Sequence, residues 1–267
     1  MSNIPILSNF YHYFYLISKM AQREVAARYR GSFLGLFWSV LTPIIMLPIY
    51  TFVFSYVFKA RWGADNSDPY EFALQLFTGL MIFNIFSECL SRAPNLVTEN
   101  INYVKKVVFP LEILPWISLI TALFHAFINL LVLSCFMLLL QHNIGLNALW
   151  FPLICLPLIF LILGLSWLLA SLGVFIRDLS QVLSMLLTAL MFMSPIFYPI
   201  SALPDSIRGY IFLNPLTLIV NQAREVLIYN HPPDFMALGY YMLLSLIIMW
   251  LGWSWFQKTR KGFADVL

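Results

Sequence analysis

The chain has 267 residues, of which 61% are hydrophobic and only 10% are charged, and its mean hydropathy is +0.84. Soluble domains carry about 25% charged residues, so this composition excludes a soluble globular protein and indicates a single membrane domain, residues 1–267. The formal net charge of +3 gives no reason to expect nucleic-acid binding, because in a membrane protein the information lies in where Lys and Arg sit relative to the apolar segments.

The first 32 residues predict an amphipathic helix that lies at the cytoplasmic surface of the membrane. Its apolar and basic residues fall on different faces, and Glu24 stands four residues before Arg28. The apolar face is formed by Phe10, Phe14, Ile17 and Ala21, and the basic face by Lys19, Arg23 and Arg30. Gly31 and Ser32 are expected to end this helix.

Six uncharged or weakly charged segments are long enough to cross a bilayer, for which about 20 apolar residues suffice. They are residues 33–58, 72–89, 114–140, 149–176, 179–198 and 235–256. Pro43 and Pro48 predict a kink in the first span. The predicted fold is therefore an all-α integral membrane protein with an N-terminal interface helix (1–32), a six-span bundle (33–256) and a short tail (257–267).

The segment between the fifth and sixth spans, residues 199–234, is rich in proline and is expected on the outer side of the membrane. Apolar residues nevertheless recur within it at helical spacing, which predicts a short helix or a pair of short re-entrant helices. These residues are Leu216, Ile219, Val220, Ala223 and Leu227.

The distribution of Lys and Arg predicts the orientation of the chain. Eleven of them fall in segments assigned to the inside, namely Lys19, Arg23, Arg28, Arg30, Arg92, Lys105, Lys106, Arg177, Lys258, Arg260 and Lys261. Four fall outside, namely Lys59, Arg61, Arg208 and Arg224. This bias predicts that both termini of this multi-pass membrane protein are cytoplasmic.

Several kinds of chemistry are disfavoured. The chain has no GxxxxGK[ST] loop for nucleotide phosphates. It has no clustered His, Asp or Glu for catalysis or metal binding. Its three Cys lie inside apolar runs, which predicts buried thiols. We therefore expect neither an enzyme nor a cofactor or metal in this chain. Glu88 and Arg92, four residues apart, are interpreted as a structural ion pair, with a proton path as the alternative. His125 and Asn129 form a second polar pair, in the third span.

Four stretches of the sequence resemble one family in the same order. They are RYRGSFLGLFW at 28–38 with LTP at 41–43, NYVKKVVFPLEILP at 102–115, Arg177-Asp178 leading to MSPIFY at 193–198, and NPL at 214–216 leading to Arg224. Together they resemble the permease subunits of ABC-2 type exporters of bacterial cell-surface polysaccharides. The motifs do not separate O-antigen, capsule and teichoic-acid exporters.

The resemblance implies a homodimer docked on two cytoplasmic ATPase subunits, which would hold the ATP and magnesium, and a lipid-linked polysaccharide as substrate. The alternative function is an ion-coupled secondary transporter or flippase that works without an ATPase. Ion coupling is disfavoured, because four of the six spans, 33–58, 114–140, 179–198 and 235–256, have no Asp, Glu, Lys or Arg near their middle.

The cytoplasmic segment 92–113 is the predicted ATPase contact, with a solvated loop as the alternative. Its candidate coupling residues combine charge with apolar side chains that suit a groove in a partner. They are Asn102, Tyr103, Lys105, Lys106, Phe109, Pro110 and Glu112.

Two further sites are predicted for the substrate. Arg28 and Arg30 stand just before the first span, where arginine forks suit the phosphates of a lipid anchor; binding to ordinary anionic lipid is the alternative. Aromatic rings in the first and fifth spans are expected to line a sugar path between two subunits, with lipid-facing aromatics as the alternative. These rings are Tyr50, Phe54, Tyr56, Phe192, Phe197 and Tyr198.

Overall fold

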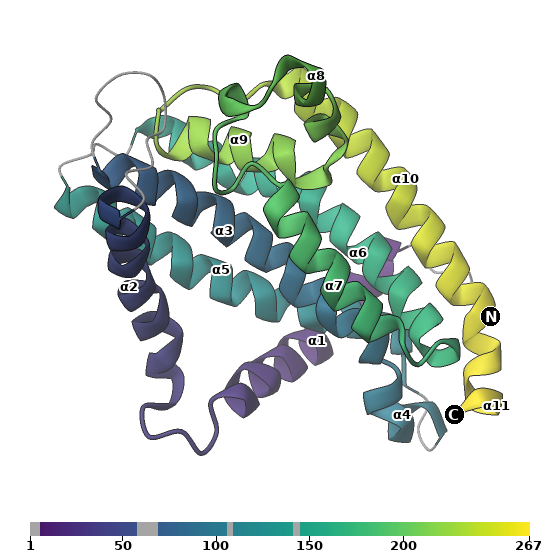
Figure 1. Ribbon diagram of the computed structural model, residues 1–267. Helices are drawn as coiled ribbons and strands as arrows, with labels where there is room; N and C mark the ends of the chain where they lie inside the picture. The colour runs from purple at the N-terminus through teal and green to yellow at the C-terminus, as the bar shows by residue number, and fades with distance from the viewer. Residues whose placement is uncertain (1–5, 58–68, 106–108, 141–144) are drawn as a thin grey trace.

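The computed structural model describes residues 6–57, 69–105, 109–140 and 145–267, and this part of the chain contains helices and no strands (Figure 1). The long helices are α1 (Ile6–Arg28), α2 (Trp38–Tyr50), α3 (Pro69–Arg92), α5 (Leu114–Leu139), α6 (Phe151–Phe175), α7 (Leu179–Met193), α9 (Pro215–Leu227) and α10 (Phe235–Thr259). The short ones are α4 (Ile101–Lys105), α8 (Asp205–Arg208) and α11 (Phe263–Val266). The predicted all-α membrane fold is confirmed.

Five helical segments of the described chain are long and apolar enough to cross a membrane. They are Gly35–Phe54, Tyr70–Asn95, Leu111–Leu139, Leu146–Phe175 and Phe235–Val266. The remaining predicted span, 179–198, corresponds to α7, which has only 15 residues and at 1.5 Å per residue is about 22 Å long, shorter than the hydrocarbon layer of about 30 Å.

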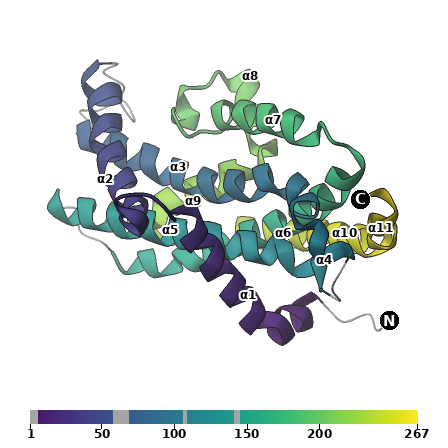
Figure 2. The same cartoon turned by 90° about the horizontal axis from the view of Figure 1, so that it is seen from below.

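Two helices form the centre of the bundle. In α3 and α6 the most apolar stretch is 78% and 61% buried, against 17 to 22% in the other three segments. Figure 2 shows α3 between α5 and α7, with α1 running obliquely beneath. α3 and α6 are therefore the scaffold on which the more exposed helices are arranged.

A very close helix crossing joins α6 to α10. A Cβ atom on Gly252 would lie 2.0 Å from the carbonyl oxygen of Gly164, and one on Gly164 would lie 2.6 Å from the Met249 backbone. Only glycine permits such a backbone approach, a common device between membrane helices.

The predicted N-terminal helix is confirmed as α1. Ile17, Ala21 and Val25, each one helical turn apart, are buried, and the helix packs against α5. Phe14, which the pattern assigned to the same face, is 53% exposed. The helix ends just before Gly31, whose φ of +83° lies in the left-handed region that glycine adopts without strain.

The first span runs without a break through Pro43 and Pro48, both inside α2. Beyond both prolines the hydrogen-bond ladder changes to a π-helix over Thr51–Val57. The part of the span that follows Tyr50 is therefore wound more loosely than α2.

The fifth span ends earlier than predicted. α7 stops at Met193 and Ser194 is extended, with ψ 148°, because a residue before proline is disfavoured in the helical region and Pro195 follows. The boundary at 198 is therefore wrong, and Phe197 and Tyr198 belong to a non-helical segment.

The helix predicted inside residues 199–234 is confirmed as α9. Its five regularly spaced apolar residues are all buried, with 0 to 5% exposure, and the helix packs against α3 and α6. Near it, α8 and the short 3-10 turn Tyr210–Leu213 complete the end of the molecule opposite α4 and α11 (Figure 1).

The three cysteines are free thiols. Cys89 and Cys155 are buried as predicted, but Cys135 is exposed on the surface of the single chain.

Candidate functional site

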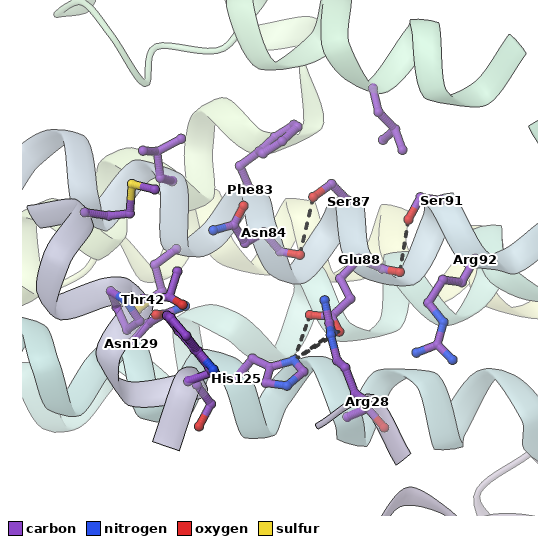
Figure 3. Close-up of a pocket in the computed structure, with 18 of the residues that line it drawn as sticks. Arg28, Thr42, Phe83, Asn84, Ser87, Glu88, Ser91, Arg92, His125 and Asn129 are labelled. Atoms are coloured by element: carbon purple, nitrogen blue, oxygen red, sulfur yellow. Dashed lines mark hydrogen bonds and ion pairs between the residues drawn. The ribbon is translucent and has the colours of Figure 1, made fainter. Parts of the chain in front are cut away.

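A cavity of about 1310 Å³ lies between α1, α2, α3, α5 and α7. Its most polar wall is one face of α3, where Asn84, Ser87, Glu88, Ser91 and Arg92 follow one another at helical spacing (Figure 3). This wall explains why the second span is less apolar than the others: its polar residues face a cavity rather than lipid.

The other walls add hydroxyl and amide groups. α5 contributes His125 and Asn129, α2 contributes Thr42 and Tyr50, and α7 contributes Thr188. Such groups both donate and accept hydrogen bonds, so the cavity is suited to a ligand rich in hydroxyl groups or carrying a charged group.

Two ion pairs connect α1 to α3. Arg28 donates from Nη1 to Glu88 Oε1, and Arg92 donates from Nη1 to Glu24 Oε1. The predicted pair between Glu88 and Arg92 is therefore wrong. Where α1 passes α3, each of these side chains reaches a partner on the other helix.

His125 is the third member of this cluster. Its Nδ1 lies 3.0 Å from both carboxylate oxygens of Glu88 and 3.3 Å from Arg28 Nη1, and its Nε2 lies 3.2 Å from the Tyr29 hydroxyl. The two contacts to Glu88 are satisfied by a proton on Nδ1. Burial raises the pKa of Tyr29, so its hydroxyl keeps its proton and can donate to or accept from Nε2.

The two predicted lipid-phosphate residues are placed differently. Arg28 lines the cavity and belongs to the ion-pair cluster. Arg30 is exposed beyond the end of α1 and is not among the described residues that line the cavity.

Three of the six predicted substrate-path aromatics stack on one another. Phe54 stacks on Phe197 with ring centroids 6.0 Å apart, and Phe197 stacks on Phe192 at 5.6 Å. Phe54 also stacks on Phe72 of α3 at 5.7 Å, so four rings form one continuous row. The row joins the first span to the segment that follows α7.

The remaining aromatic candidates flank this row. Tyr50 lies one turn before Phe54 and lines the cavity, and the Tyr198 hydroxyl donates to the carbonyl oxygen of Phe192 at 3.3 Å. The side chain of Tyr56 lies outside the described residues.

The described part of the predicted coupling segment, residues 92–105 and 109–113, consists of short 3-10 helices, turns and α4. Asn102 is exposed, Pro110 is half-buried, and the half-buried rings of Tyr103 and Phe109 stack on each other with centroids 4.5 Å apart. Lys106 and the side chain of Lys105 lie outside the described residues.

Glu112 anchors the end of this segment inside the protein. It is 8% exposed, its Oε2 accepts from Arg260 Nη1 at 2.7 Å, and its carbonyl oxygen accepts from Trp167 Nε1 at 3.0 Å. The segment is thereby tied to α6 and to the end of α10.

Arg224, which the charge count assigns to the outside, is buried within the protein. The side chain is 3% exposed and donates to backbone carbonyls of α3 and of the segment after α7. The signal was present in the sequence, because Arg224 follows Val220 by four residues and precedes Leu227 by three, which places it on the apolar face of α9.

The sequence profile of the ABC-2 type transporter family matches residues 15–228. The O-antigen export system permease protein RfbA of Myxococcus xanthus is 30% identical over 98% of this chain and 99% of its own length. A protein of the same name from Klebsiella pneumoniae is 24% identical over 99% and 100%, and the polysialic acid transport protein KpsM of Escherichia coli is 26% identical over 90% and 92%. Because these matches run over nearly the whole of each chain, the protein belongs to the ABC-2 type transporter family and is a membrane-embedded transport protein.

Proposed function

We propose that this chain is the permease subunit of an ATP-driven exporter that moves a lipid-linked cell-surface polysaccharide, O-antigen or capsule, out across the inner membrane. The observation that carries the proposal is the end-to-end similarity to O-antigen and polysialic acid transport proteins. The hydroxyl-lined and amide-lined cavity beside a row of aromatic rings supports it, since sugars combine hydrogen-bonding edges with apolar faces that pack on rings.

Two copies of the chain work with two cytoplasmic ATPase subunits, which carry the ATP and magnesium. The contact surface is the segment 92–113, whose anchored end at Glu112 passes movement of the segment on to α6 and α10. Charge reversal at Lys105 and Lys106, or Phe109→Ala, is expected to uncouple ATP hydrolysis from export.

The sugar chain passes along the aromatic row and Tyr50, and the phosphates of the lipid anchor bind near Arg28 and Arg30. This arrangement places the charged end of the substrate beside the ion-pair cluster and its sugars beside the rings. Both termini are on the cytoplasmic side, with α8 and α9 outside.

An ion-coupled transporter is the second candidate, because the carboxylate of Glu88 in contact with His125 is the kind of buried titratable pair that proton-driven transporters use. The two candidates differ in their energy source. The deciding experiment is export in inverted membrane vesicles that contain the chain and its co-expressed ATPase, supplied with lipid-linked polysaccharide.

Export that requires ATP and persists after an uncoupler collapses the proton gradient is the expected result. Export that fails only when the gradient is collapsed would instead establish ion coupling. Vesicles with the Walker lysine of the ATPase replaced serve as the control and should be inactive.

A further inference from the structure

Arg28, the proposed ligand of the lipid phosphate, is already occupied. Its guanidinium is paired with Glu88, so an arriving phosphate must compete with a carboxylate that the protein itself supplies. The Arg28 side chain is 52% exposed, whereas Glu88 is only 15% exposed. The arginine therefore reaches over the carboxylate and remains open to a ligand from the cavity.

Glu88 has a second partner in place. Both of its oxygens lie 3.0 Å from His125 Nδ1, so Glu88 keeps a hydrogen bond when Arg28 turns away. An anion buried without any partner would be costly, and His125 removes this cost from the exchange.

His125 is itself held in place by neighbours from two segments. With a proton on Nδ1 it donates to Glu88 of α3, and its Nε2 accepts from the hydroxyl of Tyr29, in the turn after α1. The imidazole is therefore positioned to keep a hydrogen bond to Glu88 when Arg28 turns away.

Apolar side chains of α2 lie near the same place. Met46 lines the cavity, and Ile44, Ile45 and Ile49 of the same helix are exposed. A ligand with its phosphate at Arg28 can lay a hydrocarbon chain along α2, which a soluble phosphate cannot exploit.

We propose that Glu88 is a built-in counter-anion that a lipid-borne phosphate displaces from Arg28, and that His125 retains Glu88 during this exchange. The inference rests on the proposed function, because it takes the lipid anchor of the substrate as the ligand. As the exchange proceeds, α1 loses one of its two ion pairs with α3 and keeps the pair between Glu24 and Arg92. Arrival of substrate thereby weakens the attachment of α1 to α3 at the end of α1 that leads into the first span.

The test is binding of a polyprenyl monophosphate to the full-length chain in nanodiscs of phosphatidylcholine, measured by native mass spectrometry. Arg28→Gln should weaken binding roughly tenfold or more, as expected for a lost charge-assisted hydrogen bond. Glu88→Gln should tighten it several-fold, because the competing carboxylate is gone. If Glu88→Gln weakens binding as Arg28→Gln does, Glu88 is not a counter-anion and the proposal is wrong.

His125 gives a test that a purely structural role would not satisfy. His125→Phe should weaken binding, because Glu88 then has no hydrogen-bond donor on α5 when Arg28 turns away, although His125 does not touch the phosphate. The double variant His125→Phe with Glu88→Gln should bind as tightly as Glu88→Gln alone. Additive effects of the two changes would contradict a role of His125 through Glu88.

Two arms control the experiment. Asp205→Asn removes an exposed ion pair, Arg208 to Asp205 at 2.9 Å on α8, and should leave binding unchanged. Inorganic phosphate should compete poorly, and equal competition would overturn the lipid source of the ligand. The assay contains neither ATPase nor polysaccharide, so its outcome is independent of whether export is driven by ATP.

Discussion

Arg224 Nε and Nη2 both donate to one acceptor, the carbonyl oxygen of Gln75, at 3.0 Å each. The same guanidinium donates to the carbonyl oxygens of Pro195 at 2.6 Å and Ile196 at 3.1 Å. A single side chain of α9 thus joins α3 to the segment in which α7 ends. Gly79 makes room for it, because a Cβ there would lie 2.9 Å from Arg224 Nη2.

Arg224→Lys is expected to destabilise the protein by roughly 2–4 kcal/mol. The compact ammonium group of lysine cannot donate to all three carbonyl oxygens that the planar guanidinium reaches. Buried carbonyl oxygens left without a donor raise the free energy of the folded state. Thermal unfolding of the purified chain in detergent measures the effect. Arg208→Lys is the matched control, since Arg208 also donates to backbone carbonyls but its side chain is 43% exposed. Equal losses of stability in the two variants would show that the buried contacts of Arg224 stabilise the protein no more than the exposed contacts of Arg208.

The contribution of Arg224 to the free energy of unfolding should not vary with pH near neutrality. Burial lowers the pKa of Arg224 to about 9, which is below the usual arginine value, so the unfolded chain binds more protons than the folded one only above about pH 8. The difference in unfolding temperature between Arg224→Lys and the native chain is therefore expected to be constant between about pH 6 and pH 8. A deficit that grows as the pH falls would point to another titrating group.

Tyr229 extends this network. Gln75 Nε2 donates to the Tyr229 hydroxyl at 2.6 Å, and that hydroxyl donates to Glu71 Oε1 at 3.1 Å. Burial, aided by Glu71, raises the pKa of Tyr229 to about 12, so the hydroxyl stays protonated and can play both roles. Tyr229→Phe should cost about 1–3 kcal/mol, because the Gln75 amide loses its acceptor. An unchanged unfolding temperature would contradict this role for the hydroxyl.

The sequence was sufficient to locate the long helices, because composition and length specify membrane spans. It also located α9, because residues 216–227 alternate apolar and polar groups with the helical period. The ion pairs were not predictable in this way: spacing brings Glu88 close to Arg92, but only the crossing of α1 over α3 brings Glu88 to Arg28 and Arg92 to Glu24. Contacts between distant segments are invisible to local periodicity.

The positions of the candidate residues were predictable in part, and their roles stay predictions. The structure places Arg28 on the cavity wall and the rings of Phe54, Phe192 and Phe197 in one row. The roles of Tyr29 and His125 as partners of the same cluster depend on long-range packing. The boundary of α7 was missed although Pro195 marks it, because hydropathy alone continues to Tyr198.

Gly252→Ala should strongly destabilise the bundle, by several kcal/mol, because the new methyl group would be forced against the carbonyl oxygen of Gly164 at 2.0 Å and well-packed interiors adapt to added volume only at a cost. Gly239→Ala on the same helix meets no atom within 4 Å and is the control, expected to be neutral or slightly stabilising. Yield of monodisperse protein and its unfolding temperature are the measurements. Tolerance of Gly252→Ala equal to that of Gly239→Ala would contradict a close crossing of α6 and α10.

The contact between Phe54 and Phe197 offers a test of the aromatic row. Their rings stack at 6.0 Å with an angle of 30° between the ring planes, and such pairs contribute about 0.5–1.5 kcal/mol beyond the area they bury. A double-mutant cycle with Phe54→Leu and Phe197→Leu should therefore give a coupling energy of about 1 kcal/mol in thermal unfolding.

A second cycle supplies the control. Phe54→Leu combined with Phe235→Leu should be additive, because Phe235 pairs with Trp150 instead, at 5.2 Å. If the row also guides sugars, as proposed, each single change should slow export modestly, whereas the pair should slow it far more than its loss of stability explains. A coupling energy near zero in the first cycle would contradict a stabilising contact between the first span and the segment after α7. A coupling energy of the expected size without any export defect would show that the row has a structural role only.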